Sequence, residues 1–402
     1  MPKTVGDSRL YRNTHQMEPL VPSLHRFEPL KAKADDVVAK GLELQHKVHS
    51  VTCSGLRELV RSMNSYYSNR IEGQSTLPRD IERALRKDLS GEPDIARRQR
   101  LAVAHIEAER ELEQAAPGSA AARSGAFLAR AHAALYGRLS REDRTAPEGR
   151  IVEPGVVRTE EVTVSQHVAP AAAALPAMTR RLDEVYARET DAGTGLVLTA
   201  CYHHRNMWLH PFIDGNGRAV RLATHVALLP ITQGLWSVNR GLARDRDEYY
   251  ARLGDADSPR RGDLDGRGNL SEEGLCRWVD FFLDVALDQV TFAGQLLRLE
   301  DVKAHIEALL ILWSAKDTGI RVEVTGALHY AFLTGEVSRG EFKQMTGLGD
   351  RTAQAALAAL LKKGILVSSS PKAPVRFGFP LDALQMLMPE LYPEADWKRG
   401  QA

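Results

Sequence analysis

The sequence contains the stretch His210-Pro-Phe-Ile-Asp-Gly-Asn-Gly-Arg-Ala-Val-Arg221, which lies between two segments of helical periodicity. Apolar residues recur at helical spacing over 194–209 and again over 216–229. Two glycines in the connection allow the backbone to turn tightly and to approach a ligand without a Cβ atom in the way. The second helix directs unpaired N–H groups and the positive end of its dipole toward this turn. We therefore expect two helices joined by an anion-binding turn.

The side chains around this turn are suited to a nucleotide polyphosphate. Arg218 and Arg221 lie three residues apart on one helix face, where both can reach a phosphate chain. Asp214 supplies the hard oxygen ligand that Mg²⁺ prefers beside phosphate oxygens, and Asn216 adds an amide donor. His210 can act as a general base toward a hydroxyl group. A Gly-x-Gly-Arg segment alone is more often a plain helix start, but these groups together favour a nucleotide site.

The same stretch is similar to the signature of the Fic family, H-P-F-x-[DE]-G-N-G-R-x-x-R, and matches every specified position. The resemblance implies a helical Fic core that transfers AMP from ATP to a Ser, Thr or Tyr hydroxyl of a target protein or of itself. It implies that His210 takes the proton from the target hydroxyl and that Asp214 binds Mg²⁺. The residues that it assigns to the phosphates are Gly215, Asn216, Gly217, Arg218 and Arg221.

Two neighbouring segments extend the resemblance. Within 147–168, Val156-Val157, Val162 and Val164 alternate with polar residues, which predicts a short β-hairpin. It resembles the family's flap, which binds a target segment by strand addition. The predicted flap residues are Val162, Thr163, Val164, Ser165, Gln166 and His167. Tyr249 and Tyr250 resemble the family's adenine-side region, where an aromatic ring can cover the base, and core packing is the alternative role for both.

A second informative segment is Ser68-Asn-Arg-Ile-Glu72-Gly73. Ser68 and Glu72 stand four residues apart on one helix face, and Gly73 can end the helix in a left-handed conformation. The segment resembles the family's inhibitory motif, [ST]-x-x-x-E-[GN]. This resemblance implies that Glu72 pairs with Arg221 and occupies the space that the γ-phosphate needs. The alternative is an ordinary glutamate on a helix surface.

Periodicity and composition divide the 402 residues into three predicted parts. Residues 1–115 form a helical region that carries the inhibitory helix, although 1–25 read as a loose arm. Residues 116–300 form the catalytic core. Residues 301–402 show helices followed by short strands at 365–367 and 375–379, which is a winged-helix order. The whole is therefore predicted to be mainly α, with a hairpin flap and a C-terminal winged-helix domain.

The alanine-rich helix predicted at 351–363 offers few side chains that could read bases. We therefore favour protein docking or a homodimer contact over DNA binding for the winged-helix domain. The 53 Lys and Arg residues against 52 Asp and Glu residues give a net charge of +1, which does not suggest bulk polyanion binding. The three separated cysteines and the absence of a long apolar segment predict a soluble, cytoplasmic protein without disulfides or a membrane span.

Two other functions remain open from the sequence. One is a winged-helix transcriptional regulator whose Fic-like core only senses a nucleotide, and the intact His210 argues against it. The other is a Fic enzyme that transfers a different group or removes AMP. The complete Gly-Asn-Gly-Arg segment argues against transfer of phosphate.

Overall fold

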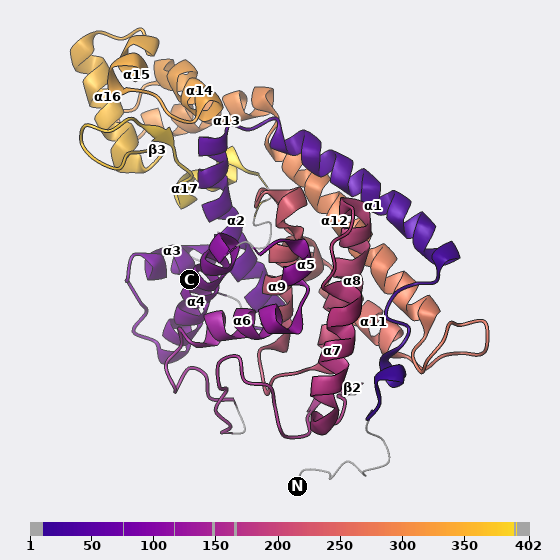
Figure 1. The fold of residues 1–402 in the computed structure, drawn as a ribbon. Coiled ribbons are helices and arrows are strands. Elements are labelled where there is room, and N and C mark those ends of the chain that lie inside the picture. The colour runs from indigo at the N-terminus through magenta and orange to yellow at the C-terminus, as the bar shows by residue number, and fades with distance from the viewer. Residues whose placement is uncertain are drawn as a thin grey trace.

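The computed structural model describes residues 11–74, 76–115, 117–146, 149–164, 167–389 and 391. Within these ranges the chain is mainly helical, as predicted, and its strands form two short hairpins (Figure 1). The helices before the nucleotide turn are α1 (Leu24–Gln45), α2 (Ser50–Ile71), α3 (Pro78–Leu85), α4 (Pro93–Ala115), α5 (Ser119–Ala122), α6 (Gly125–Tyr136), α7 (Leu175–Tyr186) and α8 (Ala192–Leu209). After the turn come α9 (Asn216–Thr232), α10 (Asn239–Arg244), α11 (Arg246–Asp257) and α12 (Glu272–Leu296).

The centre of the fold is the pair α8 and α9, which are buried on nearly all sides. Apolar residues surround both helices instead of forming one stripe, which is the pattern of a helix enclosed by others. On one side α1 and α12 lie along each other and cover α8, and on the other side α2, α4 and α6 pack against α9 (Figure 1). The turn between α8 and α9 is thereby held in place by both layers.

The segment before α1 is anchored, so the predicted loose arm is wrong for residues 11–23. It contains the 3-10 helix η2 (Thr14–Met17), and α1 already begins at Leu24. Met17 and Leu20 are buried in the core. Backbone carbonyls of this segment also accept hydrogen bonds from buried side chains. Arg205 donates to the Pro19 carbonyl at 2.6 Å, and the Tyr186 hydroxyl donates to the Leu20 carbonyl at 2.6 Å. These long-range contacts leave no local periodicity in the sequence.

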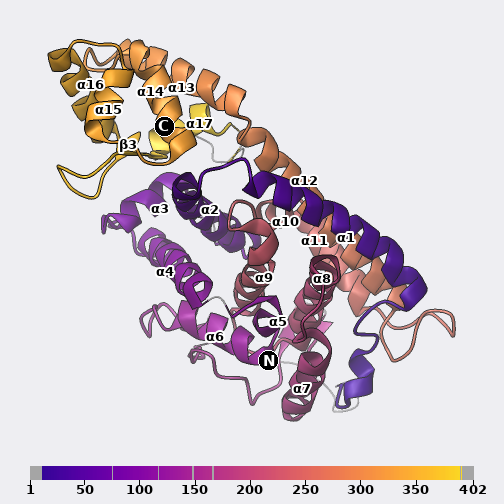
Figure 2. The same ribbon diagram turned by 45° about the horizontal axis from the view of Figure 1, so that its top comes forward.

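The C-terminal elements gather at one end of the molecule, next to α2 (Figure 2). They are α13 (Leu299–Ser314), η4 (Val322–Val324), α14 (Thr325–Thr334), α15 (Arg339–Met345), α16 (Asp350–Lys363), β3 (Leu366–Val367), β4 (Arg376–Phe377) and α17 (Leu381–Leu387). Strands β3 and β4 pair antiparallel, with Leu366 opposite Phe377. The order of elements is the predicted one, and the winged-helix assignment remains a prediction. No helix in the described ranges is both long and apolar enough to cross a membrane.

We predict that Trp278→Ala lowers the free energy of unfolding by about 3–5 kcal/mol, the usual cost of removing a large buried aromatic side chain. Trp278 on α12 is fully buried, and its Nε1 atom donates to the Ala200 carbonyl of α8 at 2.7 Å. Urea denaturation measures this change. The matched control is Leu264→Ala, because Leu264 is 95% exposed and its loss should change stability by less than about 0.5 kcal/mol. Equal effects of the two substitutions would contradict this packing.

Candidate active site

The turn between α8 and α9 is fixed by two left-handed residues and by one side chain. His210 ends α8 with φ 48°, and Gly215 precedes α9 with φ 80°. The Asn216 amide bridges the turn, since its oxygen accepts from the Phe212 N–H and its nitrogen donates to the Phe212 carbonyl, both at 2.9 Å. The predicted phosphate role of Asn216 is therefore left to its backbone N–H, because its side chain is buried and engaged within the turn.

Two residues of helix α6, His132 and Tyr136, pack against the turn. The His132 ring stacks on Phe212 with centroids 4.0 Å apart, accepts the Gly155 N–H at Nδ1 and donates from Nε2 to the Asp214 carbonyl at 3.0 Å. Burial lowers the pKa of His132 to about 4, so the ring stays neutral and can both accept and donate. The Tyr136 ring fills the space where a Cβ atom on Gly215 would lie, within 2.3 Å. Position 215 is thus restricted to glycine by backbone conformation and by packing.

The candidate base, His210, is held by Arg158, which the sequence did not identify as a site residue. The buried guanidinium of Arg158 donates from Nε to the His210 carbonyl at 2.8 Å and from Nη2 to the Pro170 carbonyl at 2.6 Å. Burial lowers the pKa of His210 to about 4, and the nearby His167 and Arg158 act in the same direction. The imidazole is therefore neutral near pH 7, which is the form that accepts a proton.

Glu72 lies at the first turn of α9, in contact with Arg221. Its Oε1 atom accepts from Arg221 Nη2 at 2.6 Å, and Ser68 accepts from the same guanidinium through Oγ at 2.9 Å and through its carbonyl at 3.1 Å. A Cβ atom on Gly217 would lie 2.3 Å from Glu72 Oε1, so the carboxylate sits against the helix N-terminus. Gly73, with φ 73°, ends α2 immediately afterwards, as predicted.

The electrostatics of this contact favour a charged pair. Burial raises the pKa of Glu72, but the charges of Arg221 and Arg218 outweigh it, so that the pKa lies below its ordinary value. The Arg221 side chain is fully buried, whereas that of Glu72 is 27% exposed. The contact therefore pairs a buried cation with a carboxylate that solvent still reaches.

A pocket of about 350 Å³ opens beside the turn, lined by Asp214, Arg218 and Tyr136 together with residues of α4 and the loop after α6. The Asp214 side chain is 46% exposed, and its Oδ1 atom accepts the Gly215 N–H at 2.6 Å. Arg218 is buried, donates to Gln74 at 3.3 Å, and its Nε atom has no hydrogen-bond partner among the described residues. Three further arginines line the pocket: Arg97, Arg98 and Arg144. The pocket can accept an anionic ligand.

The two candidate tyrosines lie in different environments. Tyr250 is 40% exposed, and its hydroxyl donates to the Ile71 carbonyl at 3.3 Å, next to Glu72. Tyr249 is fully buried, with its hydroxyl 3.0 Å from His203 Nε2 and its ring near Trp278. The predicted nucleotide contact of Tyr249 is therefore wrong in this structure, where the alternative role, core packing, applies.

The predicted hairpin is present as β1 (Thr163–Val164) and β2 (His167–Val168), with Thr163 opposite Val168. His167 anchors it, since its Nε2 atom lies 2.8 Å from the Trp208 carbonyl and its Nδ1 atom 3.3 Å from Asp257. Val162 and Thr163 are accessible at the surface. The predicted flap residues Ser165 and Gln166 lie outside the described residues.

A comparison with protein families assigns part of this site. Residues 126–228 match the model described as the Fic/DOC family, and this segment runs from α6 to α9 with the whole turn inside it. The family resemblance of the sequence therefore extends from the signature to the whole of this segment.

Solved structures of Fic proteins are similar to the chain. A Fic family protein from Desulfovibrio desulfuricans G20 is 20% identical with a TM-score of 0.49, over 86% of this chain and 95% of that one. A Fic domain containing signaling protein from Bacteroides thetaiotaomicron VPI-5482 is 18% identical with a TM-score of 0.49, over 65% and 96%. A fragment of Fic-1 from C. elegans is 16% identical with a TM-score of 0.49, over 67% and 72%.

We predict that the pKa of the His210 imidazole is about 4, well below that of an ordinary histidine, because desolvation disfavours the charged ring. An NMR titration of histidine-labelled protein follows the ring signals, and His210→Ala identifies the relevant one. A midpoint near pH 4 is expected, with the neutral ring persisting through pH 6 to 8. A midpoint near the ordinary value of about 6.5 would contradict the desolvation of the His210 ring.

Proposed function

We propose that the protein is an adenylyltransferase that transfers AMP from ATP to a Ser, Thr or Tyr hydroxyl of a target protein and of itself. The observation that carries this proposal is the neutral, partly exposed imidazole of His210, which lies at the other end of the turn from the positively polarised N-terminus of α9 with its two buried arginines. A site that only senses a nucleotide has no need of such a base. The other group transfers named above remain open alternatives.

The reaction follows from the positions of these groups. The hydroxyl oxygen attacks the α-phosphorus of ATP while His210 takes the hydroxyl proton. A phosphoester bond to the protein forms, the bond between the α-phosphorus and the bridging oxygen breaks, and pyrophosphate leaves. The N–H groups at the start of α9 and the guanidinium of Arg218 stabilise the negative charge on the phosphates.

Asp214 fits the role of the Mg²⁺ ligand. Its carboxylate is half exposed beside the pocket, and only Oδ1 is engaged by the backbone of the turn. Its second oxygen can therefore bind a hard cation. When bound, Mg²⁺ neutralises phosphate charge and orients the triphosphate.

We further propose that Glu72 holds this activity off. A carboxylate and a phosphate compete for the same guanidinium with similar geometry. Glu72 pairs with Arg221 and lies against the N-terminus of α9, so the γ-phosphate of ATP has to bind elsewhere. The α-phosphorus is then not positioned for attack by the target hydroxyl. Because the pKa of Glu72 is lowered, the carboxylate stays charged at neutral pH, and we expect release of the contact to require movement of α2 instead of protonation.

The target protein is expected to bind at two places. The accessible hairpin can pair with an extended segment of the target by strand addition. For the C-terminal elements we favour protein docking or a homodimer contact over DNA binding, because α16 is rich in alanine and two of its alanines, Ala355 and Ala358, lie on its exposed face, where they cannot read bases.

We predict that Glu72→Gly raises AMP incorporation, including self-modification, by about 10- to 100-fold. A hydrogen bond to a charged group contributes about 1.5–3 kcal/mol, and every 1.4 kcal/mol is tenfold. Incorporation is measured with ATP labelled at the α-phosphate, and label at the γ-phosphate should not be retained.

Two further variants complete this experiment. Glu72→Gln keeps the shape of the side chain but removes its charge, so it should fall between the wild type and Glu72→Gly. Adding His210→Ala to Glu72→Gly should abolish incorporation. Equal labelling of wild type and Glu72→Gly would refute the inhibitory role alone, whereas retention of γ-label would refute AMP transfer.

We also predict that the full-length chain does not retard duplex DNA in a salt-dependent manner. Phosphate contacts give affinities that fall steeply between about 50 and 200 mM salt. Gel retardation over this range tests the role of the C-terminal elements. A DNA complex whose affinity falls steeply over this salt range would contradict protein docking as the role of the C-terminal elements.

A further inference from the structure

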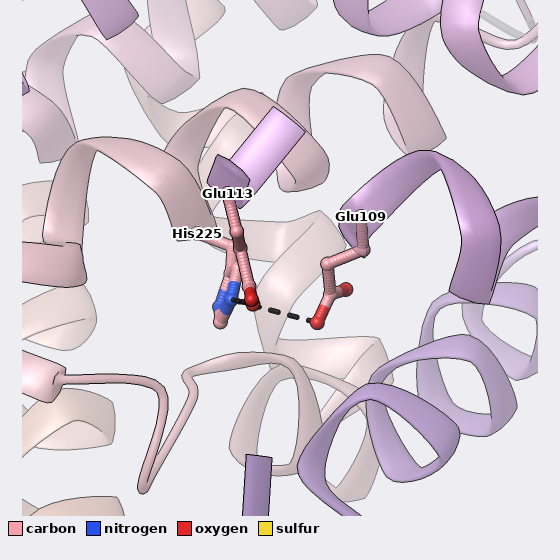
Figure 3. Close-up of side chains that lie close together, drawn as sticks. All are labelled: Glu109, Glu113 and His225. Atoms are coloured by element: carbon pink, nitrogen blue, oxygen red, sulfur yellow. Dashed lines mark hydrogen bonds and ion pairs between the residues drawn. The ribbon is translucent and has the colours of Figure 1, made fainter. Parts of the chain in front are cut away.

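Behind the active site, two glutamates of α4 and one histidine of α9 point toward one another (Figure 3). They are Glu109, Glu113 and His225, and their ligand atoms all lie within 4.8 Å of one another. The Nε2 atom of His225 is 2.8 Å from Glu113 Oε1 and 3.5 Å from Glu109 Oε1. Glu109 and His225 are completely enclosed, whereas Glu113 lies at the edge of the cluster.

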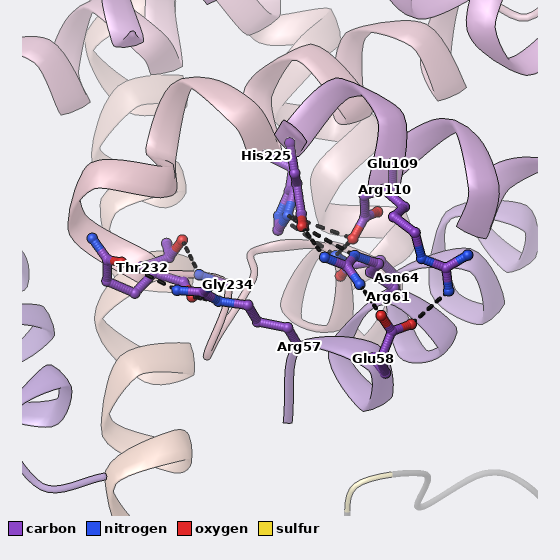
Figure 4. A network of polar contacts seen from close by, with 11 residues as sticks. Arg57, Glu58, Arg61, Asn64, Glu109, Arg110, His225, Thr232 and Gly234 are labelled. Carbon is purple, nitrogen blue, oxygen red and sulfur yellow. Dashed lines mark hydrogen bonds and ion pairs between the residues drawn. The ribbon is translucent and has the colours of Figure 1, made fainter. Parts of the chain in front are cut away.

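The charges of this cluster are not balanced by its fixed partners. Glu113 pairs with Arg61 of α2, whose Nε atom donates to Glu113 Oε2 at 3.0 Å. Figure 4 shows Arg61 in the polar network that also contains Asn64, Glu109 and His225. The two carboxylates carry two negative charges and Arg61 supplies one positive charge. A buried excess charge is costly, so a second positive charge is required. It is either a proton, on His225 or Glu109, or a bound cation.

Unsatisfied polar atoms distinguish these possibilities. His105 on α4 is completely buried, and among the described residues neither of its ring nitrogens has a hydrogen-bond partner. Its Nδ1 atom points at Glu109 Oε2 from 3.9 Å, which is too long for a hydrogen bond, and Oε2 also lacks a partner in the described ranges. A proton on His225 would serve Glu113 and leave these atoms without partners. A proton on Glu109 Oε2 would find no acceptor at His105 Nδ1, which is 3.9 Å away, so it too would leave buried polar groups unsatisfied, at about 1–3 kcal/mol for each group. A cation held by the Glu109 carboxylate satisfies it directly.

Hydrogen-bond donors of α2 already hold both carboxylates of the cluster in place. Asn64 of α2 donates to Glu109 Oε1 at 2.8 Å, and Arg61 donates to Glu113. Hydrogen bonds of this kind orient carboxylate ligands around a metal. The cluster thus has both ligand atoms and the groups that would hold them in position.

We infer that Glu109, Glu113 and His225 form a site for a divalent transition metal ion, with His105 completing or supporting it. Two carboxylate oxygens and one or two imidazole nitrogens are a ligand set for Zn²⁺, whereas Mg²⁺ and Ca²⁺ prefer oxygen alone. The ion would connect α4 to α9 and, through Asn64 and Arg61, to α2. The site lies one helical turn beyond Arg221 and is separate from the Asp214 carboxylate.

The test is a titration of the full-length, chelator-treated protein with Zn²⁺, followed by calorimetry and elemental analysis after desalting. We expect one Zn²⁺ per chain and a higher melting temperature. His225→Gln should weaken binding more than about 100-fold, beyond the 10- to 100-fold loss typical of a supporting partner. His46→Ala, which removes an exposed histidine, and Asp214→Ala, which alters the active site, should leave binding unchanged.

X-ray absorption at the zinc edge keeps the proposal testable even if His225→Gln does not fold. Nitrogen and oxygen neighbours with the outer-shell scattering of imidazole are expected. A protein that retains no Zn²⁺ after titration, a first shell without imidazole, or binding lost with Asp214→Ala but not with His225→Gln would overturn the assignment.

Discussion

A guanidinium group closed off from water needs an anion, and Arg221 is such a group at the base of this site. Removing one partner of a buried ion pair costs about 3–5 kcal/mol, because the other charge is left uncompensated. Glu72 supplies the anion, and this holds the end of α2 against the first turn of α9. A nucleotide phosphate can meet the same need. The proposed regulation is therefore a competition between two anions for one buried cation.

Helix α2 connects this competition to the rest of the chain. Its last residues carry Ser68 and precede Glu72, its middle part contributes Asn64 and Arg61 to the buried polar cluster, and its first half touches the C-terminal elements. Thr52 donates to the Phe332 carbonyl at 2.5 Å, and Tyr67 donates to the Leu391 carbonyl at 2.9 Å. A helix moves largely as one body, so contacts at its start bear on the position of Glu72. The C-terminal elements are thus placed where a bound partner can influence the site.

The sequence predicted the turn well, because its chemistry is local. The positive φ at Gly215, the two arginines on one face of α9 and the end of α2 at Gly73 all follow from spacing and residue type. The pairing of Glu72 with Arg221 spans 149 positions and came only from the family resemblance, yet the two groups are in contact. The resemblance could not say whether that contact controls activity.

The remaining site features depend on packing that no short segment encodes. Arg158 and His132 hold the turn through distant backbone carbonyls, so neither carries a recognisable motif. Tyr249 and Tyr250 are adjacent in sequence, but helical geometry sends one into the core and the other toward α2. The buried cluster around His225 likewise arises only when α2, α4 and α9 come together.

The most direct measurement of the central claim is a pair of crystal structures, of the wild type and of Glu72→Gly, each with a non-hydrolysable ATP analogue and Mg²⁺. In the wild type, we expect Glu72 on Arg221 and a γ-phosphate displaced from it. In Glu72→Gly, the γ-phosphate should contact Arg221 and the α-phosphate should face His210. The same phosphate positions in both structures would contradict the account.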